Sequence, residues 1–496
     1  MAEANPSNGY FSMGLDTLKV PVQLFAENRQ KICEKLKSFP SLPQGSIILL
    51  QGGGDQGRCE GDSSDVGPIF RQESYFHWCF GVLEPDYYGA IDVETGRSII
   101  YQPRLDENYA IIMGHIPSPE EIRERYRVDE VRYVDEIPEH LRSVVTSPGV
   151  QPTLLLLEGP NTDSGKIARP AAFDGMSEFR TDREILHHQI AECRVLKTEL
   201  ELEVLRYASK ISSLAHMHVM RTIKPGMKEY QAESTFLHHV YFYGGARHVC
   251  YNCIAAGGSS GAVLHYGHAG AANDQTIRDG AMVLFDMGAE YCCYCSDITC
   301  SYPVNGKFTA DQKIVYQAVL RAARAVFDDV RPGADWRGLH LLANRIVLED
   351  LTAAGLFTGN VDDMMAVNLA GRLLQPHGLG HFMGCDVHDV GGYLEGHPER
   401  SALPGLRSLR TARTLQANMV LTIEPGCYFI DFLIDRALAD PELSRFMVAD
   451  RINQFRGETG EIYQGQSVML IWVLGLQVLA GSGLRRTSSS LRLGRN

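Results

Sequence analysis

The chain lacks an excess of basic residues, and this absence narrows the classes of protein to which it can belong. Lysine and arginine number 47 against 60 aspartates and glutamates, which gives a formal net charge of −13 at pH 7. A protein that collects nucleic-acid phosphates needs a large basic surface, and this composition does not supply one. We therefore exclude nucleic acid as a main partner.

The chain also lacks an obvious export signal or membrane span. Its first twenty residues, MAEANPSNGYFSMGLDTLKV, have neither a basic start nor a long apolar run, so they do not resemble a secretory signal. The segment closest to a membrane span, VMLIWVLGLQVLA at 468–480, is shorter than the ~20 residues that a spanning helix needs. We expect a cytoplasmic protein without a membrane partner, in which the twelve cysteines are free thiols.

Two motifs that could indicate a cofactor are incomplete. Cys250 and Cys253 form a CxxC, but a zinc site would want a second matching pair, and the sequence shows none. The Gly-rich GGGDQG at 52–57 is not followed by Lys-Ser/Thr and lacks the longer dinucleotide-binding fingerprint. We interpret the first as free thiols and the second as a loop.

The length of 496 residues favours two domains. The first part alternates strand-like apolar runs, such as SIILLQGG at 46–53 and TLLLLEG at 153–159, with helical patterns. A long amphipathic helix over 198–223 marks a change of texture. We predict a mixed α/β (α+β) fold, with an α/β domain at 1–193, a second domain at 194–457 and a divergent, partly disordered tail at 458–496.

Helix boundaries are also marked in the second part. Thr309 and Gln312 have the spacing of a capping box, so a helix should run from there towards Asp329. A further helix is expected over 336–354, with Gly355 past its end.

Two aspartates stand eleven residues apart in VLFDMGAEYCCYCSDITCSY. We expect Asp286 on a strand over 281–288 and Asp297 on a return strand over 296–302. A hairpin can bring both carboxylates to one side of a sheet, and buried carboxylates need a cation or a cluster of donors. The two residues alone leave an alternative open, in which both are solvated near a turn.

The segment PHGLGHFMGCDVHD strengthens the metal hypothesis, because it places His377, His381 and His388 beside three glycines. Glycines let the backbone approach a site closely, and neutral imidazole is a common metal ligand. Glu424 follows an apolar run, just before a Pro-Gly turn where it could also be a plain turn residue. Oxygen ligands with one imidazole suit manganese, and two ions clamped by carboxylates can activate a hydroxide nucleophile.

Several segments taken together resemble the Xaa-Pro dipeptidases (prolidases) of the M24 metallopeptidase family, eukaryotic type. They are FRQESYFHWCFGV, HYGHAGA, FDMGAEY, SDITCSYP, PHGLGHFMGCDVHDVGGY and RTARTLQANMVLTIEPG, and the match runs from about residue 10 to Gly457. The resemblance implies a creatinase-like N-terminal domain and a C-terminal pita-bread domain. It also implies a homodimer that uses two manganese ions to hydrolyse dipeptides ending in proline or hydroxyproline.

The resemblance further implies a set of metal ligands. Asp286 matches a ligand of one ion, and Asp297 matches a ligand that bridges both. His381 and Glu424 match ligands of the other ion, and His377 is expected outside the ligand set. Glu424 or the metal-bound hydroxide is expected to handle the proton.

A second group of residues is implied on the substrate side. His265, His388 and Arg410 match residues that bind the substrate carboxylate or flank the scissile bond, and His388 is also expected to act in catalysis. The fork of an arginine suits this role, because it reads a carboxylate through two parallel hydrogen bonds.

The sequence departs from the family pattern after Gly457. Counted from the shared FRG, the position of the family's last metal-binding glutamate falls on Gln464, which is neutral. Two divalent ions bring four positive charges, whereas Asp286, Asp297 and Glu424 supply three negative ones. We expect the ion that Asp286 and Asp297 alone would serve to bind weakly or not at all. We favour a splice or frame change as the cause; the alternative is a divergent C-terminus that repacks.

Three functions stay open. The first is an Xaa-Pro dipeptidase with an impaired site, and the second is a weak or inactive pita-bread protein that acts as a dimer partner or binding module. The third is another reaction on the same fold, that of aminopeptidase P or of creatine hydrolysis. Metal content and cleavage of an Xaa-Pro dipeptide separate the first two, and use of tripeptides or creatine identifies the third.

Overall fold

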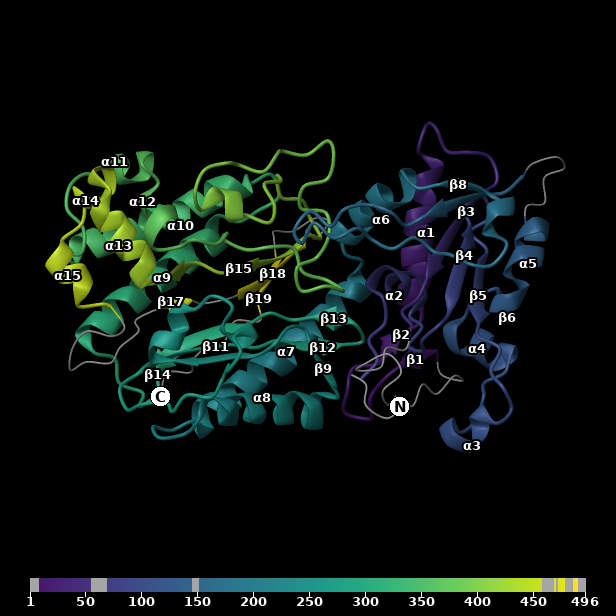
Figure 1. The fold of residues 1–496 in the computed structure, drawn as a ribbon, viewed down its shortest axis with the longest axis horizontal. Helices are drawn as coiled ribbons and strands as arrows, with labels where there is room; N and C mark the ends of the chain where they lie inside the picture. Colours follow the sequence, from purple (N-terminus) through teal and green to yellow (C-terminus); the bar gives the residue numbers. More distant parts are fainter. Residues whose placement is uncertain are drawn as a thin grey trace. The chain divides into compact units, whose positions relative to one another are not determined.

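The computed structural model describes residues 9–54, 69–144 and 151–456, together with the backbone of 468–469, 472–477 and 485–488. The chain divides into two compact units, Met1–Glu201 and Leu202–Asn496. Both contain helices and sheets (Figure 1), so the predicted mixed α/β fold class is confirmed.

The first unit is built on a six-stranded sheet of order β6-β5-β4-β3-β7-β8. Its central strand β3 pairs antiparallel with β4 and parallel with β7. The strand SIILLQ is apolar from Ile47 to Leu50 and buried except at its last residue, as is usual for a strand that is covered on both faces. The strands are β3 (Ser46–Gln51), β4 (Tyr88–Asp92), β5 (Ser98–Gln102), β6 (Glu130–Tyr133), β7 (Thr153–Leu156) and β8 (Arg180–Asp182).

Helices pack on this sheet through apolar side chains. Ile137 and Leu141 of α5 join Ile47 and Leu154 in one core cluster. In β4, the absence of a side chain at Gly89 leaves room for the ring of Phe80 of α2. The remaining elements of the unit are β1 (Tyr10–Phe11), β2 (Val20–Pro21), α1 (Gln23–Lys37), α2 (Ser74–Phe80), α3 (Tyr109–Met113), α4 (Pro119–Tyr126), α5 (Ile137–Val144) and α6 (Ile185–Val195).

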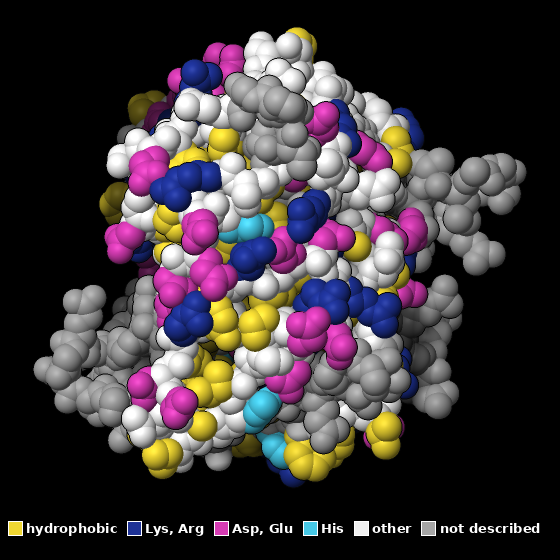
Figure 2. Space-filling view, turned by 90° about the vertical axis from the view of Figure 1, so that its right-hand side faces the viewer, with side chains coloured by type: hydrophobic (Ala, Val, Ile, Leu, Met, Phe, Trp, Pro, Cys, Tyr) yellow, Lys and Arg dark blue, Asp and Glu magenta, His cyan; other side chains and the backbone are white. Residues whose placement is uncertain are grey.

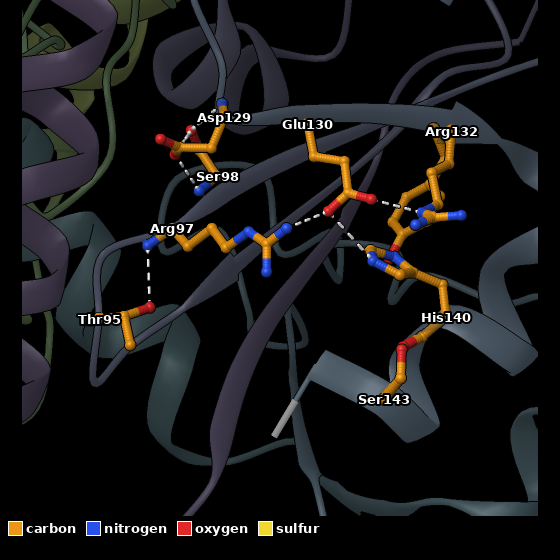
Figure 3. Close-up of polar contacts among 9 residues, drawn as sticks. Thr95, Arg97, Ser98, Asp129, Glu130, Arg132, His140 and Ser143 are labelled. Carbon is orange, nitrogen blue, oxygen red and sulfur yellow. Dashed lines mark hydrogen bonds and ion pairs between the residues drawn. The ribbon is translucent and has the colours of Figure 1, made fainter. Parts of the chain in front are cut away.

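A polar network at the edge of the sheet holds β6 to its neighbours (Figure 3). The carboxylate of Glu130 accepts hydrogen bonds of 2.5 Å from Arg97 and from Arg132. It also lies 3.3 Å from Nε2 of His140 on α5, whose Nδ1 is 2.9 Å from the Tyr101 hydroxyl. One carboxylate therefore links the edge strand, the preceding turn and the covering helix.

One face of the molecule carries charges of both signs. Figure 2 shows one face, on which basic and acidic side chains alternate over the described residues. That face offers no broad patch of positive charge among them. In the described part of the chain, no helix is long and apolar enough to span a bilayer.

The second unit begins within helix α7 (Glu199–Thr222), which packs with α8 (Glu229–Gly244) against a small sheet (Figure 1). Ala215 and Phe236 of these helices share a core cluster with Val283 and Phe285 of the sheet. The sheet has the order β10-β11-β14 and is accompanied by a second one, β13-β12-β9. Their bounds are β9 (His248–Val249), β10 (Ile254–Gly257), β11 (Met282–Asp286), β12 (Ala289–Tyr291), β13 (Tyr294–Cys295) and β14 (Thr299–Pro303).

Two predicted helices of this unit form where expected. The Thr309 side chain caps α9 by accepting a hydrogen bond from the backbone N–H of Gln312, which completes the capping box. Helix α10 ends within one residue of its predicted end. The helices of this part are α9 (Ala310–Asp329), α10 (Trp336–Ala353), α11 (Val361–Ala366), α12 (Leu369–Leu373), α13 (Asp431–Ala439), α14 (Pro441–Ser444) and α15 (Ala449–Asn453).

The C-terminal backbone adds strands beside β15 (Val420–Ile423) and β16 (Gly426–Cys427). Strand β18 (Trp472–Gln477) pairs with β15, and β17 (Val468–Met469) pairs with β16. Both ladders are antiparallel. Ile423 pairs with Trp472, and three residues further on Gly426 pairs with Met469, three residues earlier in the opposite strand, so the two ladders share one register. Strand β19 (Arg485–Ser488) pairs antiparallel with the other edge of β18. Gln464, and most of the tail expected to be disordered, lie outside the described residues.

The cysteines of the described residues are all free thiols, and most of them are buried. Burial raises the pKa of Cys33 and Cys193 to about 11 and that of Cys300 to about 12. These thiols therefore stay protonated and pack as small apolar side chains.

Candidate metal centre

One cavity in the second unit gathers every site residue that the sequence predicts. Its volume is about 270 Å³, and His377, expected outside the ligand set, also lines it. The predicted site residues in its wall are His265, Asp286, Asp297, His381, His388, Arg410 and Glu424.

The two aspartates reach the cavity from neighbouring strands, but not through the simple hairpin that the sequence suggests. Asp286 ends β11 and faces Thr299 of β14. Between them, the chain forms the short hairpin β12–β13, which turns at Cys292 and Cys293 with φ of 49° and 58°. Asp297 consequently lies just before β14 rather than on the predicted return strand.

His381 and Glu424 are held by backbone contacts between their two segments. The His381 N–H donates to the Thr422 hydroxyl at 3.0 Å, and the Thr422 N–H donates to the His381 carbonyl at 3.0 Å. The Glu424 N–H donates to the Leu379 carbonyl at 2.8 Å. This approach requires Gly380, because a Cβ there would lie 2.1 Å from the Thr422 carbonyl oxygen.

Asp297, His381 and Glu424 form a group that could hold a metal ion, because each offers a ligand atom within 4.8 Å of the others. Nε2 of His381 lies 3.1 Å from Asp297 and 3.2 Å from Glu424. Its Nδ1 lies 2.9 Å from the Phe382 carbonyl oxygen, a contact that directs Nε2 towards the carboxylates. The Thr422 hydroxyl also donates to Glu424 at 2.7 Å.

Asp286 joins this group through a tyrosine that the sequence did not reveal. The Tyr251 hydroxyl donates to Asp286 at 2.5 Å and lies 3.0 Å from Asp297. Burial, together with both carboxylates, raises the pKa of Tyr251 well above its ordinary value, so the hydroxyl remains a donor. Its position between Cys250 and Cys253 gave no local sign of this role.

The electrostatics of the buried group favour a positive charge in its centre. Burial and then the charge of Asp297 raise the pKa of Asp286 well above its ordinary value. Burial works against the imidazolium of His381, but hydrogen bonds to Asp297 and Glu424 outweigh it and raise its pKa to about 10. Burial alone would raise the pKa of Glu424, yet the contact with His381 lowers it to about 2. A divalent cation would satisfy the same carboxylates.

Histidines and an arginine also line the cavity. The ring of His388 lies 4.4 Å from that of His381, edge to face. Burial, followed by the charges of His381 and Arg410, lowers the pKa of His388 to about 2, so this imidazole is neutral. Nε2 of His377 lies 3.0 Å from the Tyr428 hydroxyl, and its Nδ1 lies 3.9 Å from Glu424.

Comparison with known proteins agrees with this geometry. Residues 203–453 match metallopeptidase family M24, and residues 25–151 match the N-terminal domain of aminopeptidase P. Xaa-Pro dipeptidase of Homo sapiens is 56% identical over 451 residues, which cover 91% of this chain and 89% of that protein. A probable Xaa-Pro aminopeptidase of Sclerotinia sclerotiorum is 32% identical over 460 residues, covering 90% of this chain and 78% of that one. The solved structure of zinc-substituted E. coli aminopeptidase P in complex with product has a TM-score of 0.71 and 27% identity, over 94% of both chains.

The fold and the buried group of carboxylates and imidazole therefore define a metallopeptidase. The chain belongs to metallopeptidase family M24, with strong homology to Xaa-Pro dipeptidases. The predicted family, the two-part fold and the enzyme class are confirmed. The family implies a divalent metal and a peptide substrate, and Asp297, His381 and Glu424 fit such an ion.

Proposed function

We propose that this chain is a manganese-dependent hydrolase of dipeptides that end in proline or hydroxyproline. The observation that best supports this is the buried set of Asp297, His381 and Glu424, with two carboxylates and one imidazole within reach of one ion. Oxygen-rich sets of this kind suit manganese better than thiolate-loving metals. The similarity to Xaa-Pro dipeptidases supports the choice of substrate.

The cavity walls suit a small, anionic substrate. Its volume of about 270 Å³ lies below the range of about 300–1,000 Å³ that is typical of pockets for drug-sized ligands. Arg410 lies in the same wall as the ligand set and can pair with the C-terminal carboxylate of a dipeptide. His265 and neutral His388 are left to contact the peptide group.

The residues then divide the chemistry among them. A divalent ion, when bound, supplies Lewis acidity towards the scissile carbonyl and lowers the pKa of water. Glu424 accepts the proton of the attacking water and delivers it to the leaving proline nitrogen. The hydrogen bond from Thr422 orients this carboxylate. His388 donates its N–H to the carbonyl oxygen as negative charge develops there.

The same geometry supports one ion rather than two. A second ion would rest on Asp286 and Asp297, and the Tyr251 hydroxyl already donates to Asp286. The strands that face β16 and β15 consist of VM and WVLGLQ, which contain no carboxylate. We infer that the second ion is held weakly and that turnover is reduced. The sequence leads to the same expectation, because neutral Gln464 stands where the family has its last metal-binding glutamate.

The test combines metal content with substrate choice. Purified protein is loaded with manganese, its metal content is measured by mass spectrometry, and an Xaa-Pro dipeptide is compared with an Xaa-Pro-Yaa tripeptide and creatine. We expect about one ion per chain, cleavage of the dipeptide alone, and loss of turnover in Glu424→Gln when it is compared at equal metal content. Two tightly held ions per chain would refute the impaired site. Preference for the tripeptide would identify an aminopeptidase.

A second function is favoured by the shortage of carboxylates around the site. Absence of both metal binding and hydrolysis would indicate a catalytically inactive binding protein. The homodimer and the cytoplasmic location also stay proposals drawn from the family resemblance. Light scattering of the purified chain tests the first, and localisation of a tagged chain in cells tests the second.

A further inference from the structure

Helix α7 presents two buried polar residues to the back of the metal-binding hairpin. Ser212 and His216 are one helical turn apart, so their side chains lie on the same face. Their exposed fractions are 0% and 1%. Neither lines the cavity, and both contact the segment that connects Asp286 to Asp297.

Ser212 closes the base of the inserted hairpin. Its hydroxyl accepts a hydrogen bond of 3.0 Å from the Ala289 N–H and lies 2.7 Å from the Ser296 hydroxyl. Ser296 in turn donates to the Ala289 carbonyl at 2.8 Å. Ser296 directly precedes Asp297, so Ser212 fixes the chain one residue from that carboxylate.

His216 contacts the backbone of the same segment next to the hairpin base, at Met287 and Ile298. Its Nε2 lies 3.0 Å from the Met287 carbonyl oxygen, and the backbone of Ile298 also faces the ring. Burial lowers its pKa to about 4, so the imidazole is neutral and donates from this nitrogen. Met287 follows Asp286 and Ile298 follows Asp297, which places His216 behind both aspartates.

We propose that Ser212 and His216 are positioning residues that set the separation and orientation of Asp286 and Asp297 for metal binding. This proposal rests on the metal site of the proposed function. The two side chains touch neither substrate nor metal and act through the backbone on either side of each aspartate.

Two physical reasons support this role. A buried donor or acceptor that loses its partner is left unsatisfied, so removing either side chain would force the hairpin to shift or admit water. Metal ligands tolerate little displacement, and the loss of supporting contacts around a metal site typically costs about 10–100-fold in affinity or activity. The hairpin turns at two cysteines with positive φ, and the side chains of Ser212 and His216 tie its base to helix α7.

The experiment measures manganese affinity directly, by titration of metal-free protein. Ser212→Ala and His216→Leu should each weaken binding by about 10-fold or more. His216→Gln keeps an N–H donor near the same place and should recover most of the affinity. Ser209→Ala is the matched control, because Ser209 is 2% exposed on the same helix and its hydroxyl has no partner among the described residues.

Kinetics supply a second measurement. For the dipeptide, we expect kcat to fall in Ser212→Ala and His216→Leu while KM changes little, because neither residue contacts the substrate. Circular dichroism and thermal unfolding verify that the variants are folded. If Ser212→Ala and His216→Leu both bind manganese as tightly as Ser209→Ala, the positioning role is overturned. If the unmodified chain binds no manganese, the proposed function fails and this proposal fails with it.

Discussion

His77 is a buried histidine whose ring has no hydrogen-bond partner on either nitrogen within the described residues. It is 0% exposed and lies edge-on to Phe25 at 5.2 Å. Burial and then the charge of Arg194 lower its pKa to about 3. An unpaired polar group in this setting costs about 1–3 kcal/mol relative to a paired one.

The substitution His77→Phe should therefore stabilise the first unit by about 1 kcal/mol at pH 8, since it removes two unpaired nitrogens and keeps a ring against Phe25. The gain should grow as the pH falls below 6.5. The folded pKa of about 3 lies below the ordinary value of 6.5, so protons bind the unfolded chain first and the histidine's penalty grows towards pH 3. Urea unfolding at pH 8 and pH 5 tests both expectations, and a loss of stability at both would contradict them.

Tyr251 offers a prediction at the metal site. Removing its hydroxyl in Tyr251→Phe takes a donor from Asp286 and Asp297 and should weaken manganese binding by about 10-fold, with little effect on unfolding. Tyr302→Phe is the control, because the buried Tyr302 hydroxyl has no partner in the described part of the chain. Equal affinities of the two variants, measured by titration, would show that Tyr251 does not orient the carboxylates.

Among the elements, the contact between the His381 segment and β15 depends on the absence of a side chain at Gly380. In Gly380→Ala the new Cβ would press on the Thr422 carbonyl oxygen, 2.1 Å away, and push the two ligand-bearing segments apart. We expect a loss of about 1–3 kcal/mol in unfolding free energy together with a loss of metal binding. Gly270→Ala, where nothing lies within 4 Å of the new Cβ, should change neither, and this pair of measurements isolates the contact.

What the sequence could predict at this scale follows from the range of the interactions. The strand over 46–53, the helix over 198–223 and the cap at Thr309 depend on neighbouring residues, and the structure has β3, α7 and α9 at these places. The convergence of Asp286, Asp297, His381 and Glu424 on one cavity was predictable from their order and the family resemblance.

Other parts of the site could not be found in this way. Tyr251 and Ser212 meet the aspartate segment across 35 and 77 residues of chain, and nothing in YNC or ISSLA marks them. The inserted β12–β13 hairpin was missed because its turn uses two cysteines with positive φ, a conformation that glycine or asparagine usually signals.

For the whole molecule, the two units have separate cores and only one of them holds the metal site. A ligand that binds the native state at 100 times its Kd stabilises it by about 2.7 kcal/mol. Manganese should therefore raise the unfolding temperature of the second unit, and a chelator should reverse the shift while the first unit is unchanged. Calorimetry with and without EDTA measures this. An equal shift of both transitions would show that the units unfold as one.

The buried thiols can report how often each unit opens. Only the thiolate reacts with alkylating reagents, and Cys33 and Cys193 in the first unit and Cys300 in the second have pKa values of about 11 to 12. Each is modified only when its surroundings open. The rate at which iodoacetamide labels each cysteine, followed peptide by peptide, therefore times the opening of each unit without any engineered probe.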